Sequence, residues 1–302
     1  MKTLHKRLTT ATLAALMAAS ISACGSKKPA SDATVAITPE MNHSDVLDSI
    51  ESAGKENAKA DVGEYVTPAE ADFTWEEVDG GVSVTGYSGE ARAIIIPAQL
   101  GGKDVVSIGK KTFAKSALTG IKLPDTVHTV GEEAFWVSTS LKEFEAGSGL
   151  KVIDKKAFML CAALSKVTLN EGLTEIRNEA FSAGSSIQEI SLPSTLTVLG
   201  RGAFYRNGMT EVVIPGSVKV IGEQAFQDSK NLKTVVVEEG VEIIEKKAFA
   251  SCDNLATVDL PASVQEYGYS VFGYPPKAVL RAPAGSAAEA YAQEKEFKFE
   301  AK

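Results

Sequence analysis

The sequence predicts an α/β solenoid of about eight stacked units, and three observations lead to this fold class. A phenylalanine recurs every 22 or 23 residues, four apolar positions repeat in register with it, and an alanine precedes the phenylalanine in most units. A unit this short has no interior of its own, so the units must stack to build one continuous core. The recurring residues are Phe113, Phe135, Phe158, Phe181, Phe204, Phe226, Phe249 and Phe272.

Each unit begins at an apolar residue, and its fourth, sixth, tenth and thirteenth residues are apolar as well. In the unit that begins at Leu118 these are Ile121, Leu123, Val127 and Val130. Because the fourth and sixth residues alternate with polar neighbours, we expect a short strand with one face inward. The tenth and thirteenth residues point inward from a second extended segment. The Ala-Phe pair is predicted to lie in a single helical or 3₁₀ turn, with its ring in the core rather than on a ligand platform.

Both ends of the stack carry sequences that predict caps, as solenoids require. Residues 73–78 and 82–87 alternate in polarity across Asp79-Gly80-Gly81, which predicts an N-terminal β-hairpin. At the other end, Ser286 and Glu289 have the spacing of a capping box, so we expect a helix through about Glu296 and then a final strand. One domain over residues 66–302 accounts for these features.

The first 65 residues differ in composition from the rest. Residues 1–23 combine early cations with an apolar run too short to span a bilayer, which predicts a signal peptide. Ile21-Ser22-Ala23-Cys24 is similar to a bacterial lipobox, in which Cys24 would carry diacylglycerol. The alternative is an ordinary secretory signal cut after Ala23, which leaves Cys24 as a free thiol. Residues 24–65 are polar and are expected to form a flexible tether.

The unit pattern Leu-x-x-Ile-x-Leu-Pro-x-x-Val-x-x-Ile-Gly-x-x-Ala-Phe resembles the BspA-like leucine-rich repeat family of bacterial surface proteins. The agreement is close over residues 118–135, 187–204 and 209–226, and weaker where Gly147, Asn170 and Glu238 replace the proline. The resemblance covers about 210 residues. It implies a curved right-handed stack of leucine-rich-repeat type, displayed outside the cell. Characterised members of the family are adhesins for host matrix proteins or for other bacteria, and many relatives have no known partner.

The residues give little support to catalysis, metal binding or nucleic-acid binding. The chain has 39 acidic and 31 basic residues and no basic cluster, which excludes strong binding to a phosphate backbone. His128 is the one histidine of the predicted domain and is expected to face solvent, without a recognisable catalytic motif around it. Cys161 and Cys252 occupy the same position four units apart, roughly 19 Å at one strand spacing per unit, so we expect buried thiols rather than a disulfide. No enzyme activity, cofactor or metal is predicted.

The outward positions three and five of the first strand form a candidate binding face. Solenoids use such extended faces for binding, so this row predicts a groove for a basic or mixed polypeptide. The alternative is a solvated face whose valines serve strand propensity. The row comprises Glu143, Glu145, Lys166, Glu189, Glu211, Val213 and Val236.

Two functions remain open at this point. The first is a lipid-anchored, extracytoplasmic surface protein whose solenoid binds a protein or glycan of a host or of other bacteria. The second is a structural component of the cell envelope that binds the wall glycan or proteins of its own cell. The ligand, the type of envelope and the oligomeric state do not follow from the sequence.

Overall fold

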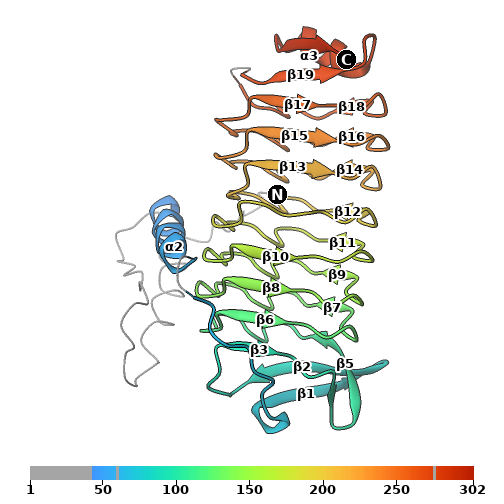
Figure 1. Cartoon of the computed structure of the whole chain (residues 1–302). Coiled ribbons are helices and arrows are strands. Elements are labelled where there is room, and N and C mark those ends of the chain that lie inside the picture. Colours follow the sequence, from blue (N-terminus) through green and yellow to red (C-terminus); the bar gives the residue numbers. More distant parts are fainter. Residues whose placement is uncertain (1–42, 59–60, 275–276) are drawn as a thin grey trace, which may run out of the picture.

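The computed structural model describes residues 43–58, 61–274 and 277–302. Within these ranges the chain coils upward as a stack of short parallel strands that runs from the hairpin end to the C-terminal cap (Figure 1). The predicted solenoid is therefore confirmed. The predicted signal peptide and Cys24 lie outside the described residues. No helix in the described ranges is long and apolar enough to cross a membrane.

One sheet runs without interruption along the stack. It begins with the predicted hairpin, in which β1 (Phe73–Val78) pairs antiparallel with β2 (Gly81–Tyr87). Strand β2 then pairs in parallel with β5 (Lys103–Ile108), against which the short β4 (Gln99–Leu100) also lies. Each later unit adds one two-residue strand around its thirteenth position. These are β7 (Thr129–Val130), β9 (Val152–Ile153), β11 (Glu175–Ile176), β12 (Val198–Leu199), β14 (Val220–Ile221), β16 (Ile243–Ile244) and β18 (Glu266–Tyr267).

The second layer, formed by positions three to six, is divided into two sheets. The first contains β3 (Ala93–Ile95), β6 (Gly120–Lys122), β8 (Glu143–Glu145) and β10 (Lys166–Thr168). The second contains β13 (Glu211–Ile214), β15 (Thr234–Val237), β17 (Thr257–Asp259), β19 (Val279–Ala282) and β20 (Lys298–Ala301). Residues 189–192, which occupy the equivalent place between β10 and β13, form no strand. We call this interruption the strand break.

The phenylalanines stack along the core as the periodicity predicts. From Phe113 to Phe272 successive rings lie nearly parallel, with centroids 4.8–5.7 Å apart. The rings from Phe135 to Phe249 have no exposed surface. The rings therefore serve as core packing rather than as a ligand platform.

The Ala-Phe pairs lie in tight turns, so the prediction of a single helical or 3₁₀ turn is wrong. Glu133 and Val137 flank Phe135 with positive φ angles of 56° and 57°, outside the helical region. Positive φ at Glu133 and Val137 thus alternates with negative φ at Phe135 between them. As a result, the N–H groups of these three residues point to the next unit rather than back along their own turn. Their acceptors are the C=O groups of Lys155, Ala157 and Met159, at 3.0, 2.7 and 2.9 Å.

The C-terminal cap consists of α3 (Ala287–Glu294) followed by β20, which pairs in parallel with β19. The helix and the final strand agree with the prediction. The predicted capping box is not formed, because Ser286 makes no side-chain hydrogen bond at the helix start. Glu289 instead accepts a hydrogen bond from the N–H of Gly285 at 2.7 Å.

The segment predicted as a flexible tether contains a docked helix, α2 (His43–Ala58), which lies against the side of the stack (Figure 1). Leu47 and Ile50 of α2 are buried against Leu160, Ala162 and Ala183. The structure thus differs from the expectation for residues 43–58, because the apolar side of the helix finds tertiary partners that the sequence pattern does not reveal. Residues 24–42 lie outside the described part of the chain.

Candidate functional site

The predicted face lies along the divided layer, and its residues are in register. Lys166 of β10 pairs with Glu143 of β8, and Val213 of β13 pairs with Val236 of β15. Glu189 lies between the two sheets, in the strand break. The sequence therefore identified one continuous row, although its members differ in exposure.

The N-terminal part of this row is covered by the chain itself. Tyr65 lies over Gly120, where a Cβ atom would overlap the tyrosine hydroxyl, and the Lys122 Nζ is 4.6 Å from the centre of the Tyr65 ring. Thr119 holds this segment by donating to the C=O of Val62 at 2.5 Å. Burial, followed by the charge of Glu143, raises the pKa of Tyr65, so its hydroxyl stays protonated.

Glu143 is consequently not exposed, contrary to the expectation from the sequence. Its exposed fraction is 8%, and its carboxylate accepts a hydrogen bond from the Lys166 Nζ at 2.5 Å. This hydrogen bond and the charge of Glu143 raise the pKa of Lys166. Glu145 forms an ion pair with Lys122 at 2.9 Å. Both glutamates on β8 are therefore committed to partners within the chain.

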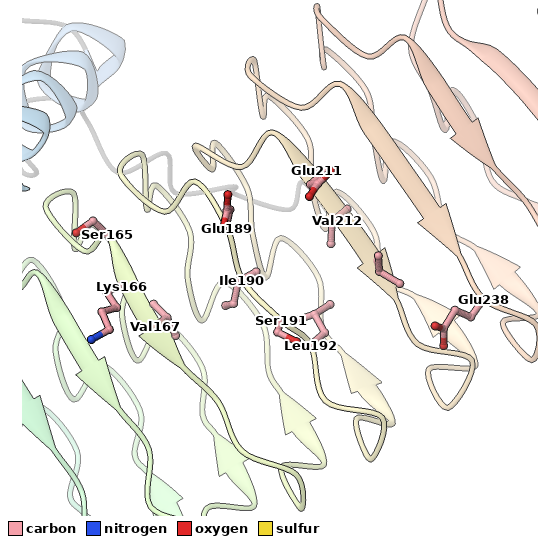
Figure 2. A pocket seen from close by; sticks show the side chains of 11 residues that line it. Ser165, Lys166, Val167, Glu189, Ile190, Ser191, Leu192, Glu211, Val212 and Glu238 are labelled. Carbon is pink, nitrogen blue, oxygen red and sulfur yellow. The ribbon is translucent and has the colours of Figure 1, made fainter.

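The open part of the row surrounds a groove at the strand break, with a volume of about 670 Å³. Figure 2 shows side chains from β10, from residues 189–192 and from β13 around it. The lining residues come from four consecutive units, because Glu238 follows β15. They are Ser165, Lys166, Val167, Glu189, Ile190, Ser191, Leu192, Glu211, Val212, Val213 and Glu238.

The floor of this groove is apolar and incompletely covered. Position four is fully buried in other units, with Ile121 at 0% and Val212 at 2% exposure. At the strand break the equivalent Val167 and Ile190 are only partly buried, and so are Leu169 and Leu192 at position six. The core is thus accessible from outside at this place.

Two exposed carboxylates lie on the rim of the groove. Glu189 and Glu211 are exposed, and neither forms an ion pair with any residue that the structure describes. Val213 beside them is 49% exposed, whereas Val236 is half-buried. The groove therefore combines a negative rim with an apolar floor.

The strand break was not predicted, since the unit from Ile187 keeps the apolar pattern. One signal was available: the stretch 187–208 has 22 residues, one fewer than its neighbours. The shortening falls in the loop that ends at Gly208, which packs so closely on the backbone of Ser185 that a Cβ atom would overlap it. This loop connects the strand break to β13.

The remaining residues singled out in the sequence lie where they were expected. His128 is exposed beside β7. Cys161 and Cys252 are buried free thiols, and each donates to a phenylalanine C=O, that of Phe135 at 3.0 Å and that of Phe226 at 3.2 Å. Within the described ranges, no group of three or more His, Cys, Asp or Glu side chains is arranged to hold a metal ion.

Similarity to known proteins agrees with this architecture. The chain is similar to the solved leucine-rich repeat protein TpLRR of T. pallidum, with 25% identity, 78% of this chain and 98% of that chain covered, and a TM-score of 0.53. It is also similar to a leucine-rich cell surface protein of Faecalibacterium prausnitzii, with 26% identity, 72% and 76% coverage, and a TM-score of 0.46. No curated protein matches.

The family assignment is based on the repeat itself. Residues 106–233 and 198–276 match the BspA type leucine-rich repeat region, in six copies. Together the two matches extend over more than half of the chain. The chain belongs to the family of proteins with BspA type leucine-rich repeats.

Proposed function

We propose that this protein is a cell-surface lipoprotein whose solenoid binds a macromolecule outside the cell. The observation that carries the proposal is the groove at the strand break, where an apolar floor meets the exposed carboxylates of Glu189 and Glu211. Exposed apolar surface bordered by polar residues is typical of protein–protein contacts. The repeat scaffold supports an interaction role rather than catalysis.

The proposed location at the cell surface depends on the N-terminal segment. A lipobox-like sequence ends at Cys24, and two or more acyl chains on that residue anchor a protein stably. Metabolic labelling with a palmitate analogue tests this part. The full chain should incorporate label and fractionate with membranes, whereas Cys24→Ala should do neither. Retention of label in Cys24→Ala would contradict the lipid anchor.

The binding role is tested with the full chain carrying Cys24→Ser, secreted in soluble form. It is applied to immobilised matrix proteins, to host cells and to the purified wall of the producing cell, at low and at physiological salt. We expect saturable binding to a host component or to other bacteria, and loss of that binding in the double variant Val213→Glu/Val236→Glu.

A matched control is available on the other sheet. Val198 of β12 is 41% exposed, close to the 49% of Val213, so Val198→Glu introduces the same charge away from the groove. This variant should bind like the parent. Saturable binding to the cell's own wall alone would instead favour the second candidate function, a structural component of the envelope.

A further inference from the structure

The strand break leaves the edge of a sheet without its partner. In regular units the backbones of neighbouring strands are joined on both sides; for example, the N–H of Leu123 donates to the C=O of Glu145 at 2.9 Å. Across the described residues, no backbone hydrogen bond joins β10 to residues 189–192. On the other side of the break, the N–H of Thr210, just before β13, donates to the C=O of Gln188, just before residues 189–192, at 3.2 Å.

The open groups on β13 can be assigned from its pairing. Parallel strands direct the backbone groups of alternate residues to opposite neighbours. Toward β15, the C=O groups of Thr210 and Ile214 accept from Lys233 at 2.8 Å and from Glu238 at 3.0 Å. The intervening Glu211 and Val213 therefore direct their N–H and C=O groups into the strand break.

An edge of this kind is a template for another strand. Four residues of β13 at about 3.3 Å each offer roughly 13 Å of edge, enough for a short extended peptide. The half-covered Ile190 and Leu192 lie beside it and would receive alternate apolar side chains. Main-chain pairing then supplies affinity, and the side-chain positions supply specificity.

The charges on β10 and β13 differ, and this difference indicates which edge a peptide would pair with and which side chains the peptide would carry. The β10 edge carries Lys166, whose charge is already paired with Glu143. The β13 edge carries Glu211, with Glu189 opposite it, and neither has an ion-pair partner in the described part of the chain. A basic side chain on the incoming strand would be placed near both carboxylates, which favours the β13 edge.

We propose that the strand break is a β-strand-addition site, in which an extended peptide with alternating apolar and basic residues pairs with the open edge of β13. This inference rests on the proposed binding function and gives that function a partner class and a mode of contact.

The probe is a library of synthetic hexapeptides X-Lys-X-Lys-X-Lys, in which X is Val, Ile, Leu or Thr. Binding to the full chain carrying Cys24→Ser is followed by fluorescence anisotropy. Members of the library should bind saturably, and the same sequences with Glu in place of Lys should not. Methylation of alternate backbone nitrogens keeps charge and side chains but removes donors, so it should weaken binding by about tenfold or more. Equal binding of the methylated peptides, or of the Glu library, overturns the proposal.

A backbone variant of the protein tests the same contact from the other side. Val213→Pro removes an N–H that β15 does not use, and proline is tolerated on an edge whose N–H groups face outward. It should lose peptide binding by about tenfold, whereas Val213→Ala, which keeps the N–H, should lose less than about threefold. Equal binding of the two variants contradicts strand addition. Circular dichroism and the melting temperature show whether Val213→Pro has kept its fold.

Further outcomes separate this inference from the proposed function. A chain that binds no peptide but binds a host component in a manner sensitive to Val213→Glu/Val236→Glu overturns strand addition and leaves the binding function standing. Self-association that Val213→Pro abolishes identifies a second copy of the chain as the occupant and overturns the basic peptide. If the parent chain binds neither the peptides nor a host or bacterial component, both proposals are refuted.

Discussion

Arg206 and Glu51 are 155 residues apart in the chain, and the Nε of Arg206 donates a hydrogen bond to Glu51 Oε1 at 2.9 Å. Asp48 accepts a second hydrogen bond from the same guanidinium. Burial alone would lower the pKa of Arg206, but the hydrogen bonds and charges of the two carboxylates outweigh it and raise the pKa. A permanently charged group therefore fixes α2 to the loop that follows Phe204.

Arg206→Ala should release α2 from the stack. The side chains of Arg206 and Glu51 are only 20% and 16% exposed, so their pair is worth more than a surface ion pair, and we expect a loss of about 1–2 kcal/mol in docking. Hydrogen exchange of residues 47–58 measures this loss directly. Arg201→Ala serves as the control, because Arg201 contacts Gln224 rather than α2. Unchanged exchange in Arg206→Ala would show that the apolar contacts alone hold the helix.

Phe181→Ala should destabilise the solenoid by about 3–5 kcal/mol, because it removes one fully buried ring from the stack and leaves a cavity. Its centroid lies 5.0 and 5.3 Å from those of Phe158 and Phe204, so both neighbours lose a contact. Urea unfolding followed by circular dichroism measures the difference. Tyr274→Ala, at a residue that is 86% exposed, should change the stability by less than about 0.5 kcal/mol. Similar effects of the two variants would contradict the contribution of the stacked rings to the stability of the solenoid.

Cys161→Ser should be tolerated within about 1 kcal/mol, since serine makes the same hydrogen bond in other units. Ser138 donates to the C=O of Phe113 at 2.7 Å, as Cys161 does to that of Phe135 at 3.0 Å. Cys161→Val removes this donor. The C=O of Phe135 keeps its other hydrogen bond, from the N–H of Ser138 at 3.0 Å, so we expect a loss of about 0.5–1.5 kcal/mol, the net value of one hydrogen bond. Equal stability of the two variants would contradict a role for the hydrogen bond.

The reactivity of the same thiols gives an independent measurement. Burial raises the pKa of Cys161, and burial likewise raises that of Cys252 to about 12. At pH 8 the folded chain therefore holds less thiolate than a free cysteine would. Alkylation of either residue should proceed only after unfolding in urea, and rapid alkylation of the native protein would be inconsistent with this burial.

Tyr267→Phe should stabilise the protein by about 1 kcal/mol, because the buried Tyr267 hydroxyl has no hydrogen-bond partner in the described structure. Burial raises the pKa of Tyr267 above its ordinary value near 10, with a smaller contribution from Tyr291. The unfolded chain thus loses its proton first, and the free energy of unfolding should fall as the pH rises above about 10. In Tyr267→Phe this fall should be shallower.

Tyr269→Phe is the matched control for that experiment, since Tyr269 is 77% exposed. It should leave the stability at pH 7 unchanged. A fall in stability for Tyr267→Phe at pH 7 would mean that its hydroxyl has a partner in solution.

Much of the fold was predictable because its determinants repeat. The interval between phenylalanines and the four apolar positions are each seen several times in one chain, so a single substitution does not hide them. The hairpin at Asp79-Gly80-Gly81 was predictable for a different reason, since its signal is local. These are the parts of the structure whose determinants are either repeated along the chain or local in the sequence.

The elements that were missed depend on contacts between distant residues. The docking of α2 depends on Arg206 and on the small Ala162, neither of which is close to it in sequence. Glu143 was placed on an open face because Tyr65, which covers it, belongs to a segment without periodicity. The strand break was missed because Val167 and Ile190 are the correct residue types, and only their exposure distinguishes them.

The uninterrupted sheet and the divided layer give the stack two mechanically different sides. From β2 to β18 every unit is joined to the next by backbone hydrogen bonds, whereas on the other side that connection is missing at residues 189–192. A force along the long axis therefore meets a stiff side and a compliant one. The stack should bend at the unit of Ile187 before it extends, and tension would widen the groove at the place where β13 is open.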